Sequence, residues 1–513
     1  MTDCPRLVLT GAAGFVGRRL IDALTGCWRI EAIDREPPLR GPHAEREGVR
    51  WHAIDVADEE SVTALFERLA ADGGACALIH LAAHYDFTGD DHPDYHRTNV
   101  EGTRILLEAS RRLGLERFVF ASSVAACEFP SAGKALDESS PPDGSHRYAV
   151  SKRAGEEMVR AAEADFPTAI VRFAALFSDW CEYAPLYHFL ETWLSGRWNA
   201  RVLGGQGRSA VPYLHVRDAC LFLQRVLERR GELGPAEVLI ASPNGATSHA
   251  ELYRAATSWS NGGHGARRPI RMPKPLATVG VWGLDALGRL RGARPFERPW
   301  MSAMIDKRLT VDASHTHRRL GWWPRERLSI LRRMPFLLEN RKAEPGSWLA
   351  RNRARLHTEH LPGPLRLQRM LEEHEEEIFA GMTRILSGDS ERWPHYAELS
   401  KTDHDWNHRM LVRALAQAVR VRERAVFRSY CRDLATRRAR QGFTEEELRG
   451  ALLTFERLCR EAALGDPRGA DLAPVVRDLV TVTVDFGLDA VDEAYEELGA
   501  AAPRSPTPNV VRV

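Results

Sequence analysis

A glycine-rich loop that directly follows a short apolar run is the feature that most restricts how this chain can fold. Residues 6–10 read Arg-Leu-Val-Leu-Thr, and residues 11–17 read Gly-Ala-Ala-Gly-Phe-Val-Gly. Residues 15–24 continue with apolar side chains at helical spacing. The order of strand, tight turn and helix predicts the first unit of a doubly wound parallel sheet, the α/β Rossmann arrangement.

The glycines of this loop have separate tasks in such a turn. Gly11 permits the turn, Gly14 lets the backbone approach a pyrophosphate, and Gly17 lets the helix pack closely on the strand. The N-terminus of the helix, with Phe15 and Val16 in its first turn, offers free N–H groups and a positive dipole end to phosphates. We therefore expect the loop to hold a dinucleotide.

Asp34 ends the second predicted strand, residues 29–33, about 20 residues after the loop. A carboxylate there accepts hydrogen bonds from the hydroxyls of an adenine ribose and repels a 2′-phosphate. The sequence therefore favours NAD as the cofactor. Arg35 could partly neutralise a 2′-phosphate, so NADP stays open as the alternative.

Tyr148 and Lys152 form the only Tyr-x-x-x-Lys sequence of the chain, which has six lysines among its 71 basic residues. On a helix these positions share one face, so the ammonium of Lys152 is carried beside the phenol. A nearby positive charge lowers the pKa of a tyrosine from its ordinary value of about 10. We expect Tyr148 to act as a proton donor or acceptor.

Further motifs follow in a fixed order at residues 55–56, 80–83, 99–103, 120–123 and 215–218. Together with the glycine loop and the Tyr–Lys pair, they make the first 338 residues resemble the extended short-chain dehydrogenase/reductase family, of the NAD-dependent epimerase/dehydratase type. Residues 320–324 are similar to the usual closing motif of that family.

The resemblance implies roles for single residues. Ser123 would bond the substrate oxygen and polarise a carbonyl, Tyr148 would transfer the proton, and Lys152 would hold the nicotinamide ribose. Ser122 would be a structural hydroxyl at the end of the strand. The cofactor would contact Gly11, Gly14, Phe15, Val16, Gly17, Asp34, Arg35, Asp55, Val56, Leu81, Ala82, Ala83, Asn99, Tyr148 and Lys152.

Residues that sugar-nucleotide members of the family use are replaced in this chain. Val211 stands where those members carry a diphosphate-binding arginine, although Arg208 nearby could substitute. Val124 and Ala125 stand where dehydratases place an Asp-Glu pair. Aromatic side chains and an apolar helix over residues 275–291 resemble instead the hydroxysteroid-dehydrogenase and dihydroflavonol-reductase branches. We expect a small-molecule substrate, an apolar alcohol or ketone, held by Tyr85, Ser123, Phe173 and Phe177.

Two other functions stay open at this point. The first is a nucleotide-sugar epimerase that keeps NAD tightly bound and regenerates it in each cycle. The second is a signalling protein that responds to NAD(H) through a further domain. The intact set of Ser123, Tyr148 and Lys152 argues against pure sensing, because a binding module needs no activated phenol.

Composition limits the partners and the compartment. A net charge of +1 gives no basic excess for nucleic acid. No apolar run is long enough to span a bilayer, and features of a signal peptide are absent from the start of the sequence. Eight scattered cysteines without C-x-x-C predict reduced thiols in the cytoplasm. The pairs His92–His96 and His404–His408 are expected on solvated helix faces, so no metal site is predicted.

The remaining residues predict a second domain. We expect an irregular linker over 339–364, a set of helices over 365–499 and a disordered tail over 500–513. Residues 396–400 and 435–448 resemble the helical sensor domain of stressosome co-antagonists, which has a globin-like fold and is usually dimeric. This resemblance implies a homodimer, or a signalling partner that contacts the all-α domain.

Overall fold

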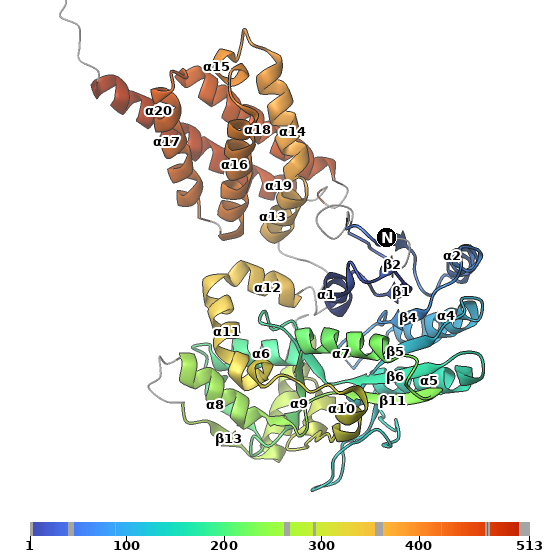
Figure 1. Cartoon of the computed structure of the whole chain (residues 1–513). Helices are drawn as coiled ribbons and strands as arrows, with labels where there is room; N and C mark the ends of the chain where they lie inside the picture. The colour runs from blue at the N-terminus through green and yellow to red at the C-terminus, as the bar shows by residue number, and fades with distance from the viewer. Residues whose placement is uncertain are drawn as a thin grey trace, which may run out of the picture. The chain divides into compact units, whose positions relative to one another are not determined.

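The chain folds into two compact units, Met1–His357 and Thr358–Val513, which are described separately. The structure is a computed structural model (Figure 1). It describes residues 4–38, 46–87, 89–260, 267–290, 294–353, 363–421, 423–466, 469 and 472–501.

A seven-stranded parallel sheet forms the centre of the first unit. Its strand order is β11-β6-β5-β4-β1-β2-β3, so the chain winds away from β1 in both directions. This confirms the predicted doubly wound sheet, in which ligands bind where the order reverses, beyond the carboxyl ends of the strands. The strands are β1 (Arg6–Thr10), β2 (Arg29–Asp34), β3 (Val49–Ala53), β4 (Ala77–His80), β5 (Arg117–Ser123), β6 (Thr168–Phe173) and β11 (Ala236–Ala241).

Helices cover both faces of this sheet, and each face has its own hydrophobic core (Figure 1). Side chains alternate along a strand, so Leu7 and Leu9 of β1 enter one core and Val8 enters the other. One face is covered by α1 (Phe15–Leu24) and α7 (Val216–Glu228), and the other by α2 (Glu59–Ala71), α4 (Gly102–Ser110) and α5 (Arg147–Ala161). Short helices α3 (Pro93–His96), η1 (Arg97–Glu101), η2 (Val124–Ala126) and η3 (Ala162–Ala164) connect these elements.

A smaller subdomain is built from the segments that follow β6, and it has a core of its own. Three pairs of short strands, β7 with β10, β9 with β12 and β8 with β13, support its helices. Its strands are β7 (Ala175–Phe177), β8 (Val202–Gly204), β9 (Ala210–Val211), β10 (Tyr213–His215), β12 (Thr247–Ser248) and β13 (Ile270–Met272). The helices in this region of the chain are α6 (Ala184–Trp193), η4 (Trp198–Arg201), α8 (His249–Ser260), α9 (Lys274–Leu290), η5 (Pro299–Met304), α10 (Ser314–Leu320) and η6 (Glu326–Leu328).

The predicted linker over 339–364 is wrong for its first half. Helix α11 (Ile330–Ala343) runs past residue 338, and α12 (Pro345–Arg353) follows it at once. Trp348 of α12 is 2% exposed within the core of the subdomain, and its Nε1 donates a hydrogen bond to Glu191 at 3.1 Å. Residues 345–353 show no periodic pattern, because α12 is held by one buried aromatic, Trp348, and one buried amide, Asn352. Residues 354–362 of the predicted linker lie outside the described residues.

The second unit is helical, as predicted. Thr444 and Glu447 form a capping box at the start of α18. The described residues of this unit contain no strand. Its helices are α13 (Gly363–Glu373), α14 (Glu375–Gly388), α15 (Pro394–Ala397), α16 (Lys401–Val421), α17 (Ala425–Arg440), α18 (Glu445–Gly465), α19 (Ala473–Val476), η8 (Arg477–Thr481) and α20 (Val482–Ala501).

Two histidines of α16, His404 and His408, lie inside the second unit. His404 and His408 are 4% and 6% exposed, so the solvated helix face predicted for them is wrong. His404 is held inside by a hydrogen bond between its Nε2 and the carbonyl oxygen of Tyr396 at 2.8 Å.

Residues 502–513 of the predicted tail lie outside the described residues. Within the described part of the chain, every helix is too short or too polar to cross a bilayer.

We predict that Trp348→Ala lowers the free energy of unfolding of the first unit by about 3–5 kcal/mol, because it leaves a large cavity in a packed core. Thermal and urea unfolding of the full chain measures this. The matched control is Trp323→Ala, which removes a tryptophan that is 58% exposed and should change stability by about 0.5 kcal/mol or less. Equal effects of the two substitutions would show that α12 is not part of this core.

Candidate active site

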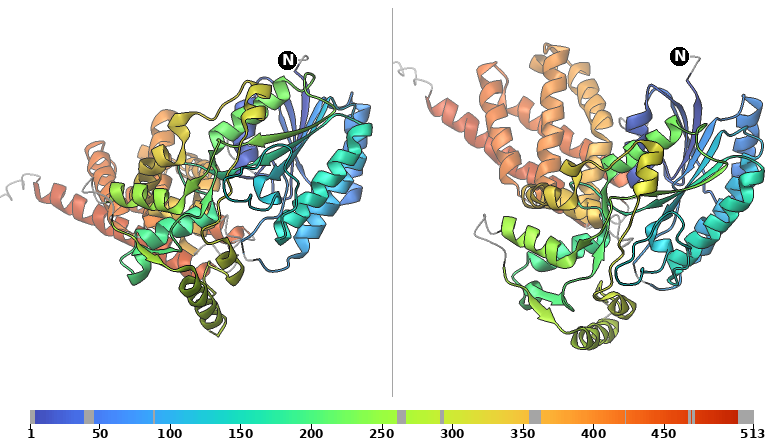
Figure 2. Two further views of the ribbon diagram at one scale, coloured as in Figure 1. Left: turned by 90° about the horizontal axis from the view of Figure 1, so that it is seen from below. Right: turned by 60° about the horizontal axis from the view of Figure 1, so that its bottom comes forward.

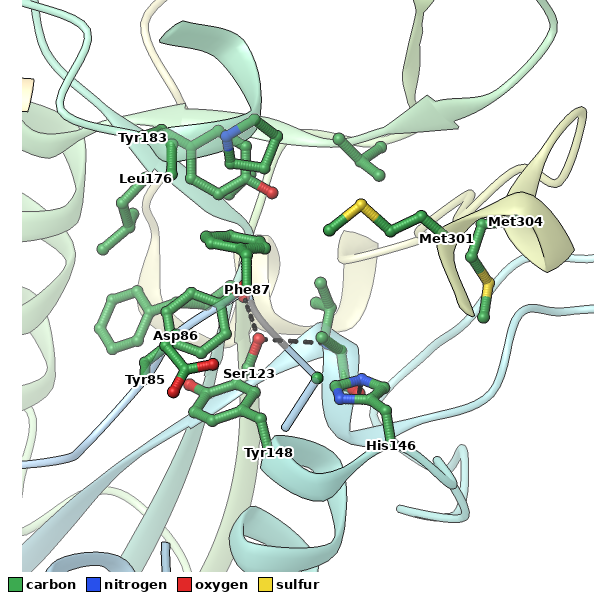
Figure 3. Close-up of a pocket in the computed structure, with 18 of the residues that line it drawn as sticks. Tyr85, Asp86, Phe87, Ser123, His146, Tyr148, Leu176, Tyr183, Met301 and Met304 are labelled. Carbon is green, nitrogen blue, oxygen red and sulfur yellow. Dashed lines mark hydrogen bonds between the residues drawn. The ribbon is translucent and has the colours of Figure 1, made fainter. Parts of the chain in front are cut away.

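A cavity of about 1340 Å³ opens at the carboxyl ends of the central strands in the first unit (Figure 3). It exceeds the range of roughly 300–1,000 Å³ that is usual for a single small ligand. The glycine loop and the ends of β2 and β4 line one part, and the smaller subdomain lines the other. The cavity therefore has room for a dinucleotide and a substrate side by side.

The backbone of the glycine loop is packed too tightly to accept side chains. Gly11 has φ of +66°, and a Cβ atom there would lie 2.7 Å from the backbone nitrogen of Ala82. A Cβ atom on Gly17 would lie 2.6 Å from the carbonyl oxygen of Ala12. The turn and the close helix packing predicted for these two glycines are confirmed. Gly14 lines the cavity between them, where a phosphate would meet the start of α1.

Asp34 lies at the end of β2 and connects that strand to the glycine loop. Its Oδ2 accepts a hydrogen bond from the backbone of Ala13 at 2.9 Å, and its Oδ1 accepts one from the backbone of Glu36 at 3.2 Å. Arg35 is 3.7 Å from the carboxylate of Asp94, measured from its Nη1. Arg35 and Asp34 both line the cavity.

The residues predicted at the adenine and along the cofactor wall line the cavity, with one exception. Asp55, Val56, Leu81, Ala82 and Ala83 are all part of its surface.

The exception is Asn99, which does not line the cavity, and its cofactor contact stays a prediction. Its amide instead ties the loop after β4 to α5. Its Oδ1 accepts from the backbone of His84 at 2.7 Å, and its Nδ2 donates to Ser151 Oγ at 3.0 Å. The position was found by its motif, but its role in positioning a loop was not visible in the sequence.

Ser123 and Tyr148 point into the same part of the cavity (Figure 3). Ser123 ends β5, and its hydroxyl accepts a hydrogen bond from the backbone of Ala125 at 3.1 Å. Tyr148 lies in the first turn of α5, which is capped by His146 through a hydrogen bond from the backbone of Ala149 to its Nδ1. The strand end and the capped helix start thus bring the two hydroxyl groups together.

The pKa of Tyr148 differs from the sequence-based expectation. Burial raises the pKa of Tyr148 well above its ordinary value, while a hydrogen bond with Ser123 acts in the opposite direction. The expected lowering by Lys152 does not dominate, because desolvation of the phenolate in an aromatic cavity is the larger effect. The ring of Tyr85 adds to this desolvation, with its centroid 4.2 Å from that of Tyr148. Tyr148 is therefore a neutral phenol at neutral pH.

Lys152 lies one turn below Tyr148 and is 4% exposed. Its Nζ donates a hydrogen bond to the carbonyl oxygen of Ala121 at 2.7 Å. Burial lowers the pKa of Lys152 to about 8, and the negative charge of Glu156 partly offsets this. The ammonium is thus poorly solvated, and its charge can act on groups inside the cavity.

A buried ion pair supports this lysine, and sequence reasoning missed it. Glu156 accepts hydrogen bonds from Arg172 Nε at 2.9 Å and Nη2 at 2.8 Å. Ser122 also donates to Glu156, at 2.6 Å, which fits the structural role predicted for that hydroxyl. The available signal was Glu156 at four residues after Lys152, on the same helix face.

The substrate part of the cavity is mostly apolar and aromatic. Tyr85 and Phe173 line it as predicted, but Phe177 is wrong, since it is fully buried in the subdomain core against His215. Phe87 and Tyr183, two of the aromatic side chains that distinguish this sequence from the sugar-nucleotide members, also line it, and the structure adds Phe296, Met301 and Met304. Figure 3 shows Phe87, Tyr183 and Met301 around the space above Ser123 and Tyr148.

Val211 and Arg208 are the residues that bear on whether the cavity can bind a diphosphate. Val211 lines the cavity, so an aliphatic side chain occupies the wall where a cation would be needed. Arg208 does not line the cavity, and its backbone N–H donates to Asp306 at 3.0 Å. The possibility that Arg208 substitutes for the missing arginine finds no support in this geometry.

Among the described residues, His84, His92 and Asp94 place potential metal-ligand atoms within 4.8 Å of one another. His84 already contacts Asp86, with Nε2 and Oδ2 3.1 Å apart, and its ring stacks on that of His92. These contacts explain the closeness of the three side chains as packing within one loop. His92 itself is exposed, as predicted.

Comparison with known proteins agrees with this site. The model of the "NAD dependent epimerase/dehydratase family" matches residues 7–241. A ceramide reductase of Caulobacter vibrioides is 30% identical over 353 residues, which is 63% of this chain and 98% of that protein. A 3 beta-hydroxysteroid dehydrogenase/Delta 5→4-isomerase of Mycobacterium tuberculosis is 32% identical over 24% of this chain, and the match spans 32% of that protein. The chain thus spans about a third of the length of that relative.

Solved structures share the fold. A UDP-glucose 4-epimerase of Thermotoga maritima superposes with a TM-score of 0.50 at 18% identity, covering 66% of this chain and 99% of that one. The chain belongs to the NAD-dependent epimerase/dehydratase family of extended short-chain dehydrogenases/reductases. NAD is the cofactor of that family, and the tight glycine cradle with Asp34 beside it fits a dinucleotide.

We predict that Lys152→Met stabilises the fold at pH 7 by up to about 3 kcal/mol while abolishing turnover. The pKa of Lys152 is lowered on folding, so the cost of burying its charge is fully present below pH 8 and disappears as the pH rises through the unfolded value near 10.5. Urea unfolding at pH 7 and at pH 10.5 measures the difference. A stability gain that persists unchanged at the higher pH would contradict this assignment.

Proposed function

We propose that the protein is an NAD-dependent oxidoreductase that reduces the ketone of an apolar, long-chain lipid, or oxidises the corresponding alcohol. The observation that carries this proposal is the apolar wall of the substrate part, with Val211 in place of a diphosphate-binding cation. A nucleotide sugar brings two phosphates that need fork-shaped cationic donors. An aliphatic and aromatic wall instead gains free energy by burying hydrocarbon.

The similarity to the ceramide reductase supports the lipid class of substrate. That similarity extends over nearly the whole length of the ceramide reductase. Ceramides are long-chain amino alcohols that carry an acyl chain, so a cavity for them must be large and apolar. The volume of about 1340 Å³ and the lining by Phe87, Tyr183, Met301 and Met304 agree with that requirement.

Three residues would perform the proton chemistry. The hydroxyl of Ser123, which accepts from Ala125 and donates a long bond of 3.5 Å to the carbonyl oxygen of Phe173, can turn to donate to a substrate oxygen. Tyr148, a neutral phenol, would give its proton to the same oxygen. Lys152 would stabilise the phenolate left behind and hold the cofactor ribose. Bound nicotinamide supplies or accepts the hydride.

The direction of proton transfer follows from the pKa of Tyr148. Because burial raises that pKa, the phenol carries its proton at neutral pH and is ready to act as an acid. An acid beside the substrate oxygen assists reduction of a ketone, whereas oxidation of an alcohol needs the phenolate. With its proton in place, Tyr148 is set to assist reduction, and the same residue serves oxidation of the alcohol when it starts as the phenolate.

The alternative function is a nucleotide-sugar epimerase with tightly bound NAD. Solved structures of that class share the fold, at 18% identity in the example above, which does not extend to a substrate. The wall at Val211 and the position of Arg208 outside the cavity disfavour a nucleoside diphosphate. A response of the second unit to NAD(H) is the other alternative, and it does not account for the paired hydroxyls of Ser123 and Tyr148.

We further propose that the helical unit forms a homodimer or receives a signalling partner, and that the protein acts in the cytoplasm. Two observations support the first part: the helical unit has a hydrophobic core of its own, and residues 396–400 and 435–448 resemble the helical sensor domain of stressosome co-antagonists. Sedimentation of the full chain tests the dimer directly. A monomer at all concentrations would remove the dimer proposal and leave the oxidoreductase proposal intact.

Tyr148→Phe should lower turnover of a long-chain ketone by about 10²–10⁴-fold, because the substrate oxygen loses its proton donor. Binding of NADH, followed by its fluorescence, should stay within a few-fold of the unaltered protein. The matched control is Tyr187→Phe, which removes the hydroxyl of a tyrosine buried outside the cavity. Full activity of Tyr148→Phe would remove the proposed acid.

Asp34→Ser should weaken NAD binding about tenfold and strengthen NADP binding, since a carboxylate that accepts from ribose hydroxyls also repels a 2′-phosphate. The ratio of the two dissociation constants measures this preference. Asp165→Ser, which removes an exposed carboxylate paired with Arg111, serves as the control and should leave the ratio unchanged. A protein that already prefers NADP would contradict the assignment of NAD.

A further inference from the structure

Helix α9, Lys274–Leu290, exposes large apolar side chains to solvent. Leu276 is 62% exposed, Val279 is 70% exposed and Leu290 is 86% exposed. In both views of Figure 2 this helix lies at the lower edge of the first unit. We call its exposed apolar residues the α9 face: Leu276, Val279, Trp282, Leu284, Leu287 and Leu290.

The opposite side of α9 is fixed to the protein by charges. Asp285, the only acid of the helix, is 2% exposed. Its carboxylate accepts hydrogen bonds from Arg289 Nε at 3.0 Å, Arg294 Nε at 2.9 Å and Arg298 Nη1 at 3.3 Å. Ala277 is also buried, and the helix packs against η5. The α9 face therefore points outward because the polar side is held inward.

The α9 face is continuous with the wall of the cavity. Ala277, Gly280, Val281 and Leu284 of the same helix line the cavity, and Leu284 belongs to both surfaces. Gly280 lines the cavity, and a Cβ atom there would meet no neighbouring atom within 4 Å, so there is open space beside the helix at this point. A long apolar molecule beside α9 is thus close to the substrate part of the cavity.

The exposed charges within residues 267–290 are all positive, and acids near this segment include Asp90, which pairs with Arg294 at 3.3 Å, and the exposed Glu297. Between residues 267 and 290 the only acid is Asp285, which is buried and neutralised as described. The cations of this segment are all exposed, and they are Arg267, Arg268, Arg271, Lys274 and Arg289. An apolar helix face with cations at its margins fits the surface of an anionic bilayer. A second copy of the same face would bring like charges together.

We propose that the α9 face docks the first unit on an anionic phospholipid bilayer, with the cavity opening beside the lipid. The apolar side chains enter the boundary between headgroups and acyl chains, and the flanking cations contact anionic headgroups. The docking proposal depends only on the α9 face and its surroundings, and not on the proposed function. The passage of a long-chain ketone from the bilayer into the cavity rests on the proposed function.

The test is flotation of the full-length protein with vesicles of phosphatidylcholine, either alone or mixed with phosphatidylglycerol. We expect binding to the mixed vesicles, and the triple variant Leu276→Ser, Val279→Ser, Leu290→Ser should weaken it about tenfold or more. These three residues do not line the cavity. The matched control replaces three exposed apolar residues of the second unit, Val426→Ser, Leu453→Ser and Leu464→Ser, and should bind as the unaltered protein does.

The charge contribution needs its own variant. Arg267→Glu, Arg268→Glu, Arg271→Glu should weaken binding to the mixed vesicles and leave the weaker binding to pure phosphatidylcholine unchanged. Binding that does not depend on phosphatidylglycerol would overturn the anionic part of the proposal. NAD binding and the thermal unfolding midpoint of each variant confirm that it is folded.

Three results would overturn docking by the α9 face. The unaltered protein fails to float with either vesicle, the two triple serine variants float equally, or the α9 triple variant changes the protein from dimer to monomer in solution without vesicles. The last result would identify a second copy as the partner of this face.

Failure of the proposed function gives a different pattern. A soluble short-chain ketone and a long-chain ketone in vesicles are offered to the same proteins. Loss of vesicle binding by the α9 triple variant, with no ketone reduced by any protein, leaves docking intact and removes the lipid reductase. If the α9 triple variant reduces the soluble ketone normally and the vesicle ketone slowly, both proposals are supported.

Discussion

The close approach of the glycine loop to the end of β4 determines the geometry of the site. Gly11 turns with positive φ, and there is no space for a Cβ atom beside Ala82. The loop, the cofactor wall at the end of β4 and the carboxyl end of β5 are therefore held at fixed separations. Ser123 ends β5, and Tyr148 lies in the first turn of α5, which packs on β5. The positions of the two reacting hydroxyl groups are therefore set by the same separations. The substrate subdomain then encloses the same space from the other side.

Desolvation connects the fold to the chemistry. The cavity surrounds Tyr148 with aromatic rings, which raises the pKa of the phenol, and it buries Lys152, which lowers the pKa of the ammonium. The buried pair of Glu156 and Arg172 supports the lysine from below. An environment of this kind suits an apolar substrate, because neither the wall nor the substrate requires water. The same environment would be costly for a diphosphate without a cationic clamp.

Much of the first unit could be predicted from sequence, because the strand, turn and helix pattern and the motif spacings depend on local geometry. The glycine loop, Asp34, Ser123, Tyr148 and Lys152 were all located this way. The errors concern contacts between distant parts of the chain, which local patterns do not encode.

Particular residues and one helix illustrate this limit. Asn99 is used to hold a loop, Phe177 turns into the core, and α12 is fixed by Trp348 with little periodicity of its own. The raised pKa of Tyr148 depends on rings brought in from other segments, such as that of Tyr85. In the second unit, a helix pattern alone could not tell that the polar residues His404 and His408 face inward.

The central claim is that hydride passes between nicotinamide and an apolar ketone. The most direct measurement offers the purified protein NADH together with a long-chain ketone lipid or with UDP-glucose, and follows NADH and both products. The account predicts that NADH is consumed in step with formation of the lipid alcohol, while UDP-glucose is unchanged. Interconversion of UDP-glucose and its 4-epimer by protein-bound NAD, with no reduction of the lipid ketone, would contradict it.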